Sequence, residues 1–198
     1  MAKQPRALRT YEQVLNAAAQ EFAQHGYAEA NLQRIAERTG MTKGALYGHF
    51  PSKRALATAL VDHLEAATDH LLGSACAECG PPLDRLRSLL LALAVRIRRD
   101  VRVRAALRLV TETARGTAKP PRLMDGVHER ALELVLRAQQ AGQVDPALPP
   151  EPVADLVVVV LFGAHCTDYT RDGGDLPTRL GTLWDILTRA LPPTRTAA

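Results

Sequence analysis

The feature that most constrains the fold is the stretch from Leu32 to Phe50, LQRIAERTGMTKGALYGHF. Ala36, Gly40 and Leu46 stand at relative positions 0, +4 and +10, which is the spacing of a helix-turn-helix. A small residue lets the first helix approach the second, a glycine takes the tight turn, and an apolar residue holds the second helix inward. The alternative is two ordinary short helices of a core, because this spacing also arises by chance.

The residues after Gly40 favour the DNA-binding interpretation. Thr42 can cap a helix whose exposed first turn carries Lys43 and Gly44. A recognition helix presents its N-terminal side chains and amides to DNA in this way. Lys43 is the strongest candidate for a base contact, because an amine can donate to O6 and N7 of guanine.

The positive charge is concentrated on the same part of the chain. The net charge is +4, and residues 1–54 hold eight Lys and Arg against four Glu, whereas the remaining residues hold 17 basic and 17 acidic side chains. The whole surplus therefore lies where it would neutralise DNA phosphates. If these charges only contacted solvent, we would not expect the positive surplus to be confined to residues 1–54.

The residues before the motif predict an arm and two helices. Ala2–Arg9 is polar and basic without periodicity, so we expect an irregular arm. Thr10 with Gln13 fits a capping box, which would open a first helix that Gly26 ends. Asn31 would cap the helix that begins the motif.

The rest of the chain predicts further helices and no strands. Alanine, leucine, valine and arginine are abundant and aromatic residues make up 4% of the chain, which favours helix over sheet. Breaks at Pro, Gly or charged residues bound helices over 52–74, 83–99, 101–115, 121–141, 151–171 and 177–191. The expected fold class is therefore all-α, with about nine helices, and the expected domains are residues 1–52 and residues 53–198.

The helix expected over 151–171 is apolar on nearly all sides, which indicates that it is either deeply buried or shared with a partner. One face carries Val153, Leu156, Val157, Val160 and Ala164. Because two-fold operators require two-fold proteins, we expect this helix and the one over 177–191 to form a four-helix interface in a homodimer. The alternative is the internal core of a monomer.

The run TKGALYGHF, followed by SK and a long helix, resembles the tetracycline-repressor (TetR) family of transcriptional regulators. The N-terminal run AKQPRALRT…VLNAAAQEFAQHGYAEANLQRIAERTG resembles the γ-butyrolactone-receptor branch of that family. The resemblance covers about residues 3–60 and returns in ALRLVTE (106–112) and LWDILTRALPP (183–193). One departure is Gly48, where the family has an aromatic residue. This glycine weakens the helix end by up to about 1 kcal/mol relative to alanine.

The resemblance implies that residues of the arm, the recognition helix and the start of the next helix bind double-stranded DNA. The recognition helix would meet base edges and phosphates, while the arm, including Lys3, would follow the backbone or enter a minor groove. The implied DNA-binding residues are Arg6, Arg9, Thr10, Thr42, Lys43, Gly44, Tyr47, His49 and Lys53.

The resemblance also implies that residues 53–198 form a ligand-binding and dimerisation domain with an apolar cavity for a small hydrophobic effector. The expected polar or aromatic lining is Thr111, Thr113, His128, Gln139, His165 and Trp184. The branch carries a tryptophan where this chain has His128, so a butenolide, an acidic furan or an antibiotic intermediate fits as well as a butyrolactone. The effector would release the repressor from a pseudo-palindromic operator that controls secondary-metabolite or antibiotic genes.

Two other kinds of regulator remain open at this stage. Cys76 and Cys79 form a CxxC pair, and His63 and His70 upstream share a helix face, so these four residues could bind a metal or sense redox state. A surface turn with small thiols is the simpler interpretation of that pair. A drug-efflux regulator is a further alternative with the same fold.

Other classes of protein are disfavoured. No nucleophile elbow, phosphate-binding glycine loop or HExxH pair points to an enzyme, and we expect no cofactor. The N-terminus lacks an apolar signal region, and the longest apolar run, 157–164, is too short to span a bilayer. A cytoplasmic protein that does not enter the membrane is therefore expected.

Overall fold

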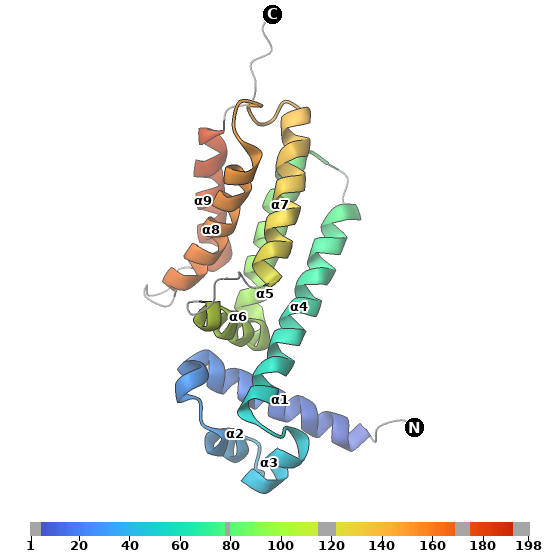
Figure 1. Ribbon diagram of the computed structural model, residues 1–198, viewed down its shortest axis with the longest axis vertical. Coiled ribbons are helices and arrows are strands. Elements are labelled where there is room, and N and C mark those ends of the chain that lie inside the picture. The colour runs from blue at the N-terminus through green and yellow to red at the C-terminus, as the bar shows by residue number, and fades with distance from the viewer. Residues whose placement is uncertain (1–4, 78–79, 115–121, 169–174, 192–198) are drawn as a thin grey trace, which may run out of the picture. The chain divides into compact units, whose positions relative to one another are not determined.

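The computed structural model describes residues 5–77, 80–114, 122–168 and 175–191. Within these ranges the chain forms helices and no strands, which confirms the all-α prediction (Figure 1). The helices are α1 (Pro5–Glu29), α2 (Leu32–Arg38), α3 (Lys43–His49), α4 (Lys53–Ala77), α5 (Pro82–Arg99), α6 (Val101–Ala114), α7 (Arg122–Gln140), α8 (Pro150–Asp168) and α9 (Leu176–Ala190). The bounds predicted for α4 to α9 agree with these to within one helical turn.

The chain divides into two compact units. Unit 1 comprises residues 1–67 and 99–121, and unit 2 comprises residues 68–98 and 122–198. The division falls inside α4, and α6 belongs to the same unit as the N-terminal helices. The functional boundary expected after residue 52 stays a prediction.

The first helix begins earlier than predicted. α1 starts at Pro5, so the capping box proposed for Thr10 and Gln13 is wrong, and Arg9 lies on a helix rather than on an irregular arm. Proline suits a first turn because its missing N–H would have no intrahelical partner there. The alanine, leucine and arginine residues that follow are strong helix formers, and they extend the helix through the segment that lacked periodicity.

Gly26, expected to end the first helix, does interrupt it. Its φ of 70° and ψ of −174° lie in a region that glycine alone adopts readily. α1 therefore breaks at this residue, and one further turn runs on to Glu29.

The two caps predicted for the helix-turn-helix are confirmed. The Asn31 side-chain oxygen accepts from the Gln33 N–H at 2.8 Å, and the Thr42 hydroxyl oxygen accepts from the Ala45 N–H at 3.2 Å. Gly40 takes the turn between α2 and α3 with a φ of 67°. Local sequence chemistry therefore fixes where both helices of the motif begin.

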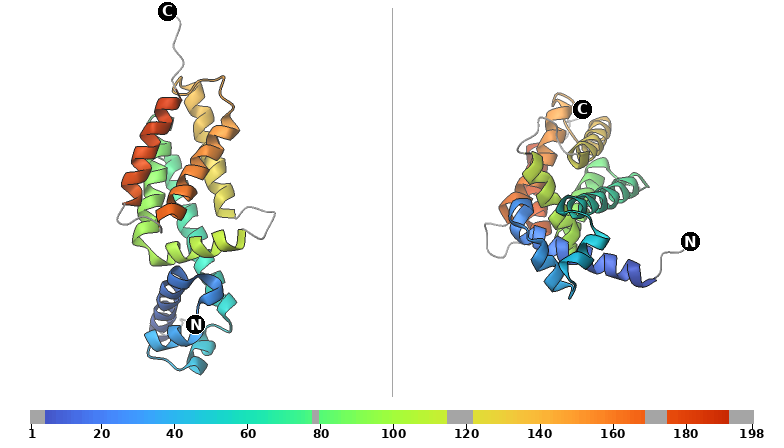
Figure 2. Two further views of the ribbon diagram at one scale, coloured as in Figure 1. Left: turned by 90° about the vertical axis from the view of Figure 1, so that its left-hand side faces the viewer. Right: turned by 60° about the horizontal axis from the view of Figure 1, so that its bottom comes forward.

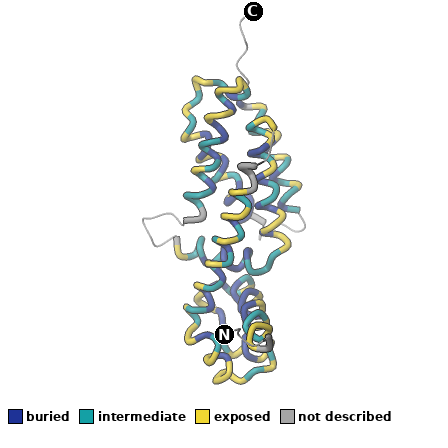
Figure 3. The backbone as a smooth tube through the Cα atoms, turned by 90° about the vertical axis from the view of Figure 1, so that its right-hand side faces the viewer, coloured by how far each residue is buried: buried dark blue, intermediate teal, exposed yellow. Residues whose placement is uncertain are grey.

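Each unit has its own apolar core, and buried positions recur along the helices between exposed ones (Figure 3). In unit 1 the largest fully buried apolar side chains are Phe22, Ile35, Leu46, Leu56, Leu60 and Leu107. In unit 2 they are Leu86, Leu134, Leu161, Leu176 and Leu180. Each such side chain contributes about 1.5–3 kcal/mol by leaving water.

In unit 2, α8 packs between α7 and α9 (Figures 1 and 2). Polar contacts join α5 to the same group, since the Arg98 guanidinium lies 2.7 Å from Asp175, the N-cap residue of α9. No helix among the described residues is long and apolar enough to cross a lipid bilayer.

Candidate nucleic-acid interface

The helix-turn-helix exposes the side chains that the sequence assigned to DNA contact. Thr42, Lys43, Gly44 and Tyr47 are exposed and His49 is half-buried, whereas Leu46 is buried against the rest of unit 1. α3 therefore has one face anchored in the core and another that presents an amine and a phenol to solvent. This division of faces is what insertion into a major groove requires.

Arg9 and Thr10 lie on α1 in the same unit. Arg9 is exposed, and Thr10 is half-buried. Arg6 lies in the first turn of the helix, but its side chain and all of Lys3 lie outside the described residues. Because Arg9 lies within α1, its backbone has a defined position, which an irregular arm would not provide.

Lys53 has an internal role that the sequence did not indicate. Its ammonium donates to the Ala28 carbonyl oxygen at 3.0 Å and lies 4.9 Å from the centroid of the Tyr27 ring. The side chain therefore ties the start of α4 to the last turn of α1, after the break at Gly26. Because an ammonium has three N–H donors, this bond leaves two for a phosphate.

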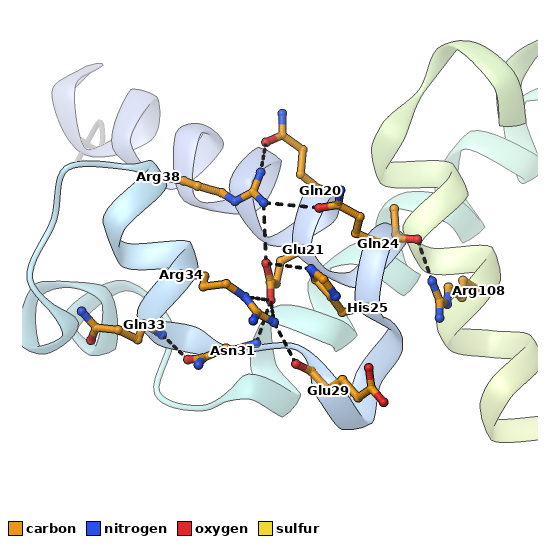
Figure 4. A network of polar contacts seen from close by, with 11 residues as sticks. Gln20, Glu21, Gln24, His25, Glu29, Asn31, Gln33, Arg34, Arg38 and Arg108 are labelled. Carbon is orange, nitrogen blue, oxygen red and sulfur yellow. Dashed lines mark hydrogen bonds and ion pairs between the residues drawn. The ribbon is translucent and has the colours of Figure 1, made fainter.

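The most unusual group in unit 1 is the carboxylate of Glu21, which is 0% exposed (Figure 4). Its Oε1 accepts from the Arg34 Nε–H at 2.7 Å and from the Asn31 N–H at 3.0 Å. Burial raises the pKa of the Glu21 carboxyl, but the hydrogen bonds from Arg34 and Asn31 lower it by more, so its pKa lies below the ordinary value. Glu21 is therefore held as a buried anion.

The second oxygen of Glu21, Oε2, is buried and has no hydrogen-bond partner among the residues that the structure describes. Arg38 Nη2 lies 3.9 Å from this oxygen and His25 Nε2 lies 4.0 Å from it. Arg38 also donates to Gln20 Oε1 at 3.2 Å and to Gln24 Oε1 at 3.4 Å (Figure 4). One stretch of α1 thus holds both arginines of α2.

Sequence reasoning missed this network, although a signal for it was present. Glu21 falls on the apolar stripe of α1 that also carries Val14, Ala18 and Phe22. An acidic residue at such a position is buried only when cations or N–H groups compensate it. The sequence pattern does not by itself identify Arg34 and Arg38 as the compensating cations.

Helix α6 binds to α1 at two levels. Near the start of α6, Arg102 donates to Asn16 Oδ1 at 2.6 Å and to the Glu12 carbonyl oxygen at 3.1 Å. Further along α6, Arg108 donates to the Ala23 carbonyl oxygen at 2.8 Å. Both arginines bond to backbone or side-chain oxygens of α1, which joins the two helices into one rigid piece of unit 1.

The end of α1 is held by Glu112 of α6. Arg108 Nε donates to Glu112 Oε1 at 2.8 Å, and Glu112 Oε2 accepts from the Tyr27 N–H at 2.9 Å. This N–H directly follows Gly26, where the backbone leaves helical geometry. A side chain on Gly26 would overlap the Glu112 carboxylate, so the position of that carboxylate depends on glycine there.

Asp100 connects α4 to the start of α6 within unit 1. Its Oδ1 accepts from the Arg102 N–H at 2.9 Å, which caps α6, and its Oδ2 lies 3.2 Å from His63 Nε2. Burial raises the pKa of Asp100, but the bonds from His63 and the backbone N–H groups lower it by more, so its pKa lies below the ordinary value.

The residues expected to line an effector cavity are divided between the units. Thr111 and Thr113 lie on α6 in unit 1, and their hydroxyls donate to the Arg108 and Leu109 carbonyl oxygens of their own helix. The remaining expected lining residues, all in unit 2, are His128, Gln139, His165 and Trp184.

Those residues of unit 2 occupy different settings. His165 on α8 and Trp184 on α9 are buried. His128 lies 3.2 Å from Asp155 of α8, and Gln139 donates to the Asp145 and Leu148 carbonyl oxygens, which fixes the turn after α7. Gln139 thus has a structural role, while His165 and Trp184 are the buried polar and aromatic groups of the expected set.

The alternative metal or redox site is only partly described. His63 pairs with Asp100 and His70 is exposed, whereas the side chains of Cys76 and Cys79 lie outside the described residues. Among the side chains that the structure describes, no three His, Cys, Asp or Glu groups are placed to hold a metal ion. The metal and redox alternative stays a prediction.

Comparison with known proteins places the chain among regulators. Residues 14–60 match the family model "Bacterial regulatory proteins, tetR family". The A-factor receptor protein of Streptomyces griseus is 32% identical over 186 residues, a match that covers 93% of this chain and 64% of that protein. The chain thus spans somewhat less than two thirds of that relative's length.

Solved structures agree with this placement over nearly the whole chain. A γ-butyrolactone receptor described as ArpA-like is 28% identical with a TM-score of 0.82, and the match covers 96% of this chain and 91% of that one. CprB, a TetR family protein from Streptomyces coelicolor A3(2), is 30% identical with a TM-score of 0.77, covering 94% of this chain and 91% of that one. CprB has also been solved in complex with its biological operator sequence. The chain therefore belongs to the tetR family of bacterial regulatory proteins, and within that family it is similar to the γ-butyrolactone receptors.

Proposed function

We propose that the chain is a ligand-responsive transcriptional repressor that binds a pseudo-palindromic operator as a homodimer. The observation that carries this proposal is the capped helix α3, which anchors Leu46 and exposes Lys43 and Tyr47. In a dimer, the two recognition helices would enter successive major grooves about 34–36 Å apart. Lys43 would donate to a base edge, and Tyr47, His49 and Lys53 would bind phosphates.

The exposed faces of α8 and α9 support the dimer. On α8 the exposed face includes Leu156, Val159 and Gly163, and on α9 it includes Thr182 and Ile186. Val159 is 64% exposed and Ile186 is 59% exposed, which is unusual for branched aliphatic side chains on neighbouring helices. Exposed apolar groups that gather in this way mark a surface for association.

Unit 2 is the proposed site of effector binding. Relatives of the chain include proteins named as receptors for A-factor and for γ-butyrolactone. The buried His165 and Trp184 provide a polar and an aromatic group within helices whose other buried side chains are Leu, Val, Ala and Phe. We infer an effector with an alkyl part and a small polar head, of butyrolactone, butenolide or furan type, and target genes of secondary metabolism.

Two features support transmission of an effector signal to the DNA-binding residues. Helix α4 is continuous from Lys53 to Ala77 and is shared between the two units. Within unit 1, α6 is bonded to α1 through Arg102 and Arg108, and α1 in turn holds α2 through Glu21. An effector that favours a different pose of α4 or α6 would thereby select a state that no longer fits the operator.

The proposal is tested by titrating the DNA upstream of the protein's own gene with the full chain in a gel-shift assay. The same titration is then repeated with an organic extract of a stationary-phase culture of the organism that encodes it. We expect a discrete complex at low protein concentration, competed by the same fragment but not by unrelated DNA, and dissolved by the extract. Absence of a specific complex on any fragment that flanks the gene would refute the repressor, whereas a complex that no extract dissolves would refute only the effector.

A further inference from the structure

We infer that Glu21 is a positioning residue for operator binding, because its buried carboxylate fixes the pose of α2 and, through the turn, that of the recognition helix α3. This inference rests on the proposed function of α3 as the DNA-binding helix. Glu21 itself is fully buried, so it would act without touching DNA.

The first step of the argument is that α2 is too short to hold itself in place. It spans seven residues, and isolated helices of that length do not persist in water. Its start is capped by Asn31, whose own N–H needs an acceptor. In a capping box the fourth residue supplies that acceptor as Glu or Gln, but here that position is Arg34.

Glu21 supplies the missing acceptor from a different helix. Its Oε1 accepts from the Asn31 N–H and from Arg34 Nε, so the cap and the first turn of α2 both bind to one atom of α1. Arg34 also donates to the Glu29 carbonyl oxygen at 3.0 Å. The arrangement has the bonding of a capping box, but its acid comes from ten residues upstream of the cap.

The partners of Glu21 are directed almost wholly at α2. Apart from His25 on its own helix, the groups that face the carboxylate are Asn31, Arg34 and Arg38 (Figure 4). A buried ion pair is seldom the most stable filling of its space, since a well-packed apolar side chain often serves as well or better. The network therefore fixes the orientation of α2 relative to α1, because hydrogen bonds constrain orientation more tightly than apolar contacts do.

The turn transmits the pose of α2 to α3. The Thr39 and Met41 N–H groups donate to the Ala36 carbonyl oxygen at 3.1 and 3.0 Å, and the Gly40 N–H donates to the Glu37 carbonyl oxygen at 3.1 Å. These three bonds, donated by residues 39–41, fix the turn to the end of α2, and α3 begins directly after it with its cap, Thr42. A tilt of α2 relative to α1 would therefore tilt the surface that carries Lys43.

The test compares Glu21→Leu with Glu29→Leu in the full chain. Both changes remove one negative charge from α1, but the Glu29 side chain is exposed. The measurements are the melting temperature, the affinity for the operator and the affinity for unrelated DNA at the same salt concentration. The ratio of the two affinities reports specificity, which a purely structural role would not alter in the folded protein.

We expect Glu21→Leu to stay folded but to melt below the wild-type temperature, because the Asn31 N–H loses its acceptor. It should also lose about tenfold or more of its specificity ratio, while Glu29→Leu keeps the ratio. Glu21→Gln should recover much of the loss, because its carbonyl oxygen can still accept from Asn31 and Arg34. A folded Glu21→Leu protein with the wild-type ratio would overturn the inference. A wild-type protein that binds no flanking DNA specifically would instead overturn the proposed function.

If Glu21→Leu does not fold, Arg34→Met decides the question from the other side of the network. Loss of a phosphate contact by Arg34 would weaken operator and unrelated DNA equally and leave the ratio unchanged. Loss of the pose would lower the ratio, as it would for Glu21→Leu. An unchanged ratio in folded Arg34→Met would therefore refute the positioning role.

Discussion

At the scale of single residues, Lys43 is the side chain for which the strongest DNA prediction can be made. It stands at the start of α3 and is exposed, next to the cap that Thr42 provides. Lys43→Ala should weaken operator binding by about 1–3 kcal/mol and relax the preference at one base pair, because a base-edge donor is lost. Titration against operators with each base pair replaced in turn would measure this, and uniform weakening at every position would show a phosphate contact instead.

Arg9 should behave differently from Lys43, because its place on α1 favours a phosphate contact. Arg9→Ala should lower affinity for all DNA sequences and reduce the slope of log affinity against log salt concentration by about 1. Parallel titrations of operator and unrelated DNA over a range of salt concentrations provide the measurement. Arg9→Lys, which keeps the charge, is the matched control and should retain most of the slope.

At the scale of elements, the contact of the Glu112 carboxylate of α6 with the end of α1 depends on Gly26. Gly26→Ala should destabilise the protein by about 1–3 kcal/mol through its backbone conformation alone. The overlap of the new Cβ with the Glu112 carboxylate should add to that cost. Gly40→Ala, which also has a positive φ but has open space around the added atom, should cost less.

A double-mutant cycle with Glu112→Ala separates the two causes. If the Glu112 carboxylate contributes, Gly26→Ala should cost less free energy of unfolding in the Glu112→Ala background than in the wild type. Urea unfolding of the four proteins measures the coupling. Equal costs in the two backgrounds would assign the whole effect to the backbone.

The cap of α6 should give the stability of unit 1 a specific dependence on pH. A carboxyl whose pKa is depressed by folding adds stability above its unfolded-state pKa, and that stability is lost as the pH falls through its folded-state value. Asp100→Ala should cost about 1 kcal/mol at neutral pH, and the difference from wild type should narrow below about pH 4. Asp100→Asn keeps an acceptor for the Arg102 N–H and should retain most of the cap at neutral pH. Urea unfolding at several pH values provides the measurement, and a constant difference would show that Asp100 acts only by packing.

Sequence patterns predicted those elements whose signals are local. The caps at Asn31 and Thr42, the break at Gly26 and the all-α class follow from residues within one turn of the feature they determine. The predicted start of α1 is wrong because Thr10 and Gln13 match a capping box by chance. The helix begins upstream of that match, at Pro5. The contacts of Glu21 and Glu112 could not be predicted, since each joins residues from different helices and depends on the tertiary arrangement.

At the scale of the whole molecule, the proposed function requires two copies of the chain, because one helix-turn-helix binds only a half-site. Val159→Glu combined with Ile186→Glu places a carboxylate on the exposed face of each of α8 and α9. We expect this variant to stay folded, since both positions are open to solvent in one chain, but to become monomeric and lose most of its operator affinity. Sedimentation equilibrium and a gel shift on the same samples measure the two effects.

The matched control for that variant is Leu136→Glu on α7, where the side chain is 42% exposed but is not assigned to the interface. It should remain dimeric and bind the operator as the wild type does. A dimeric Val159→Glu, Ile186→Glu protein would place the interface elsewhere. A monomeric variant that kept full operator affinity would contradict the two-fold docking itself, because the second half-site would then contribute nothing to the free energy of binding.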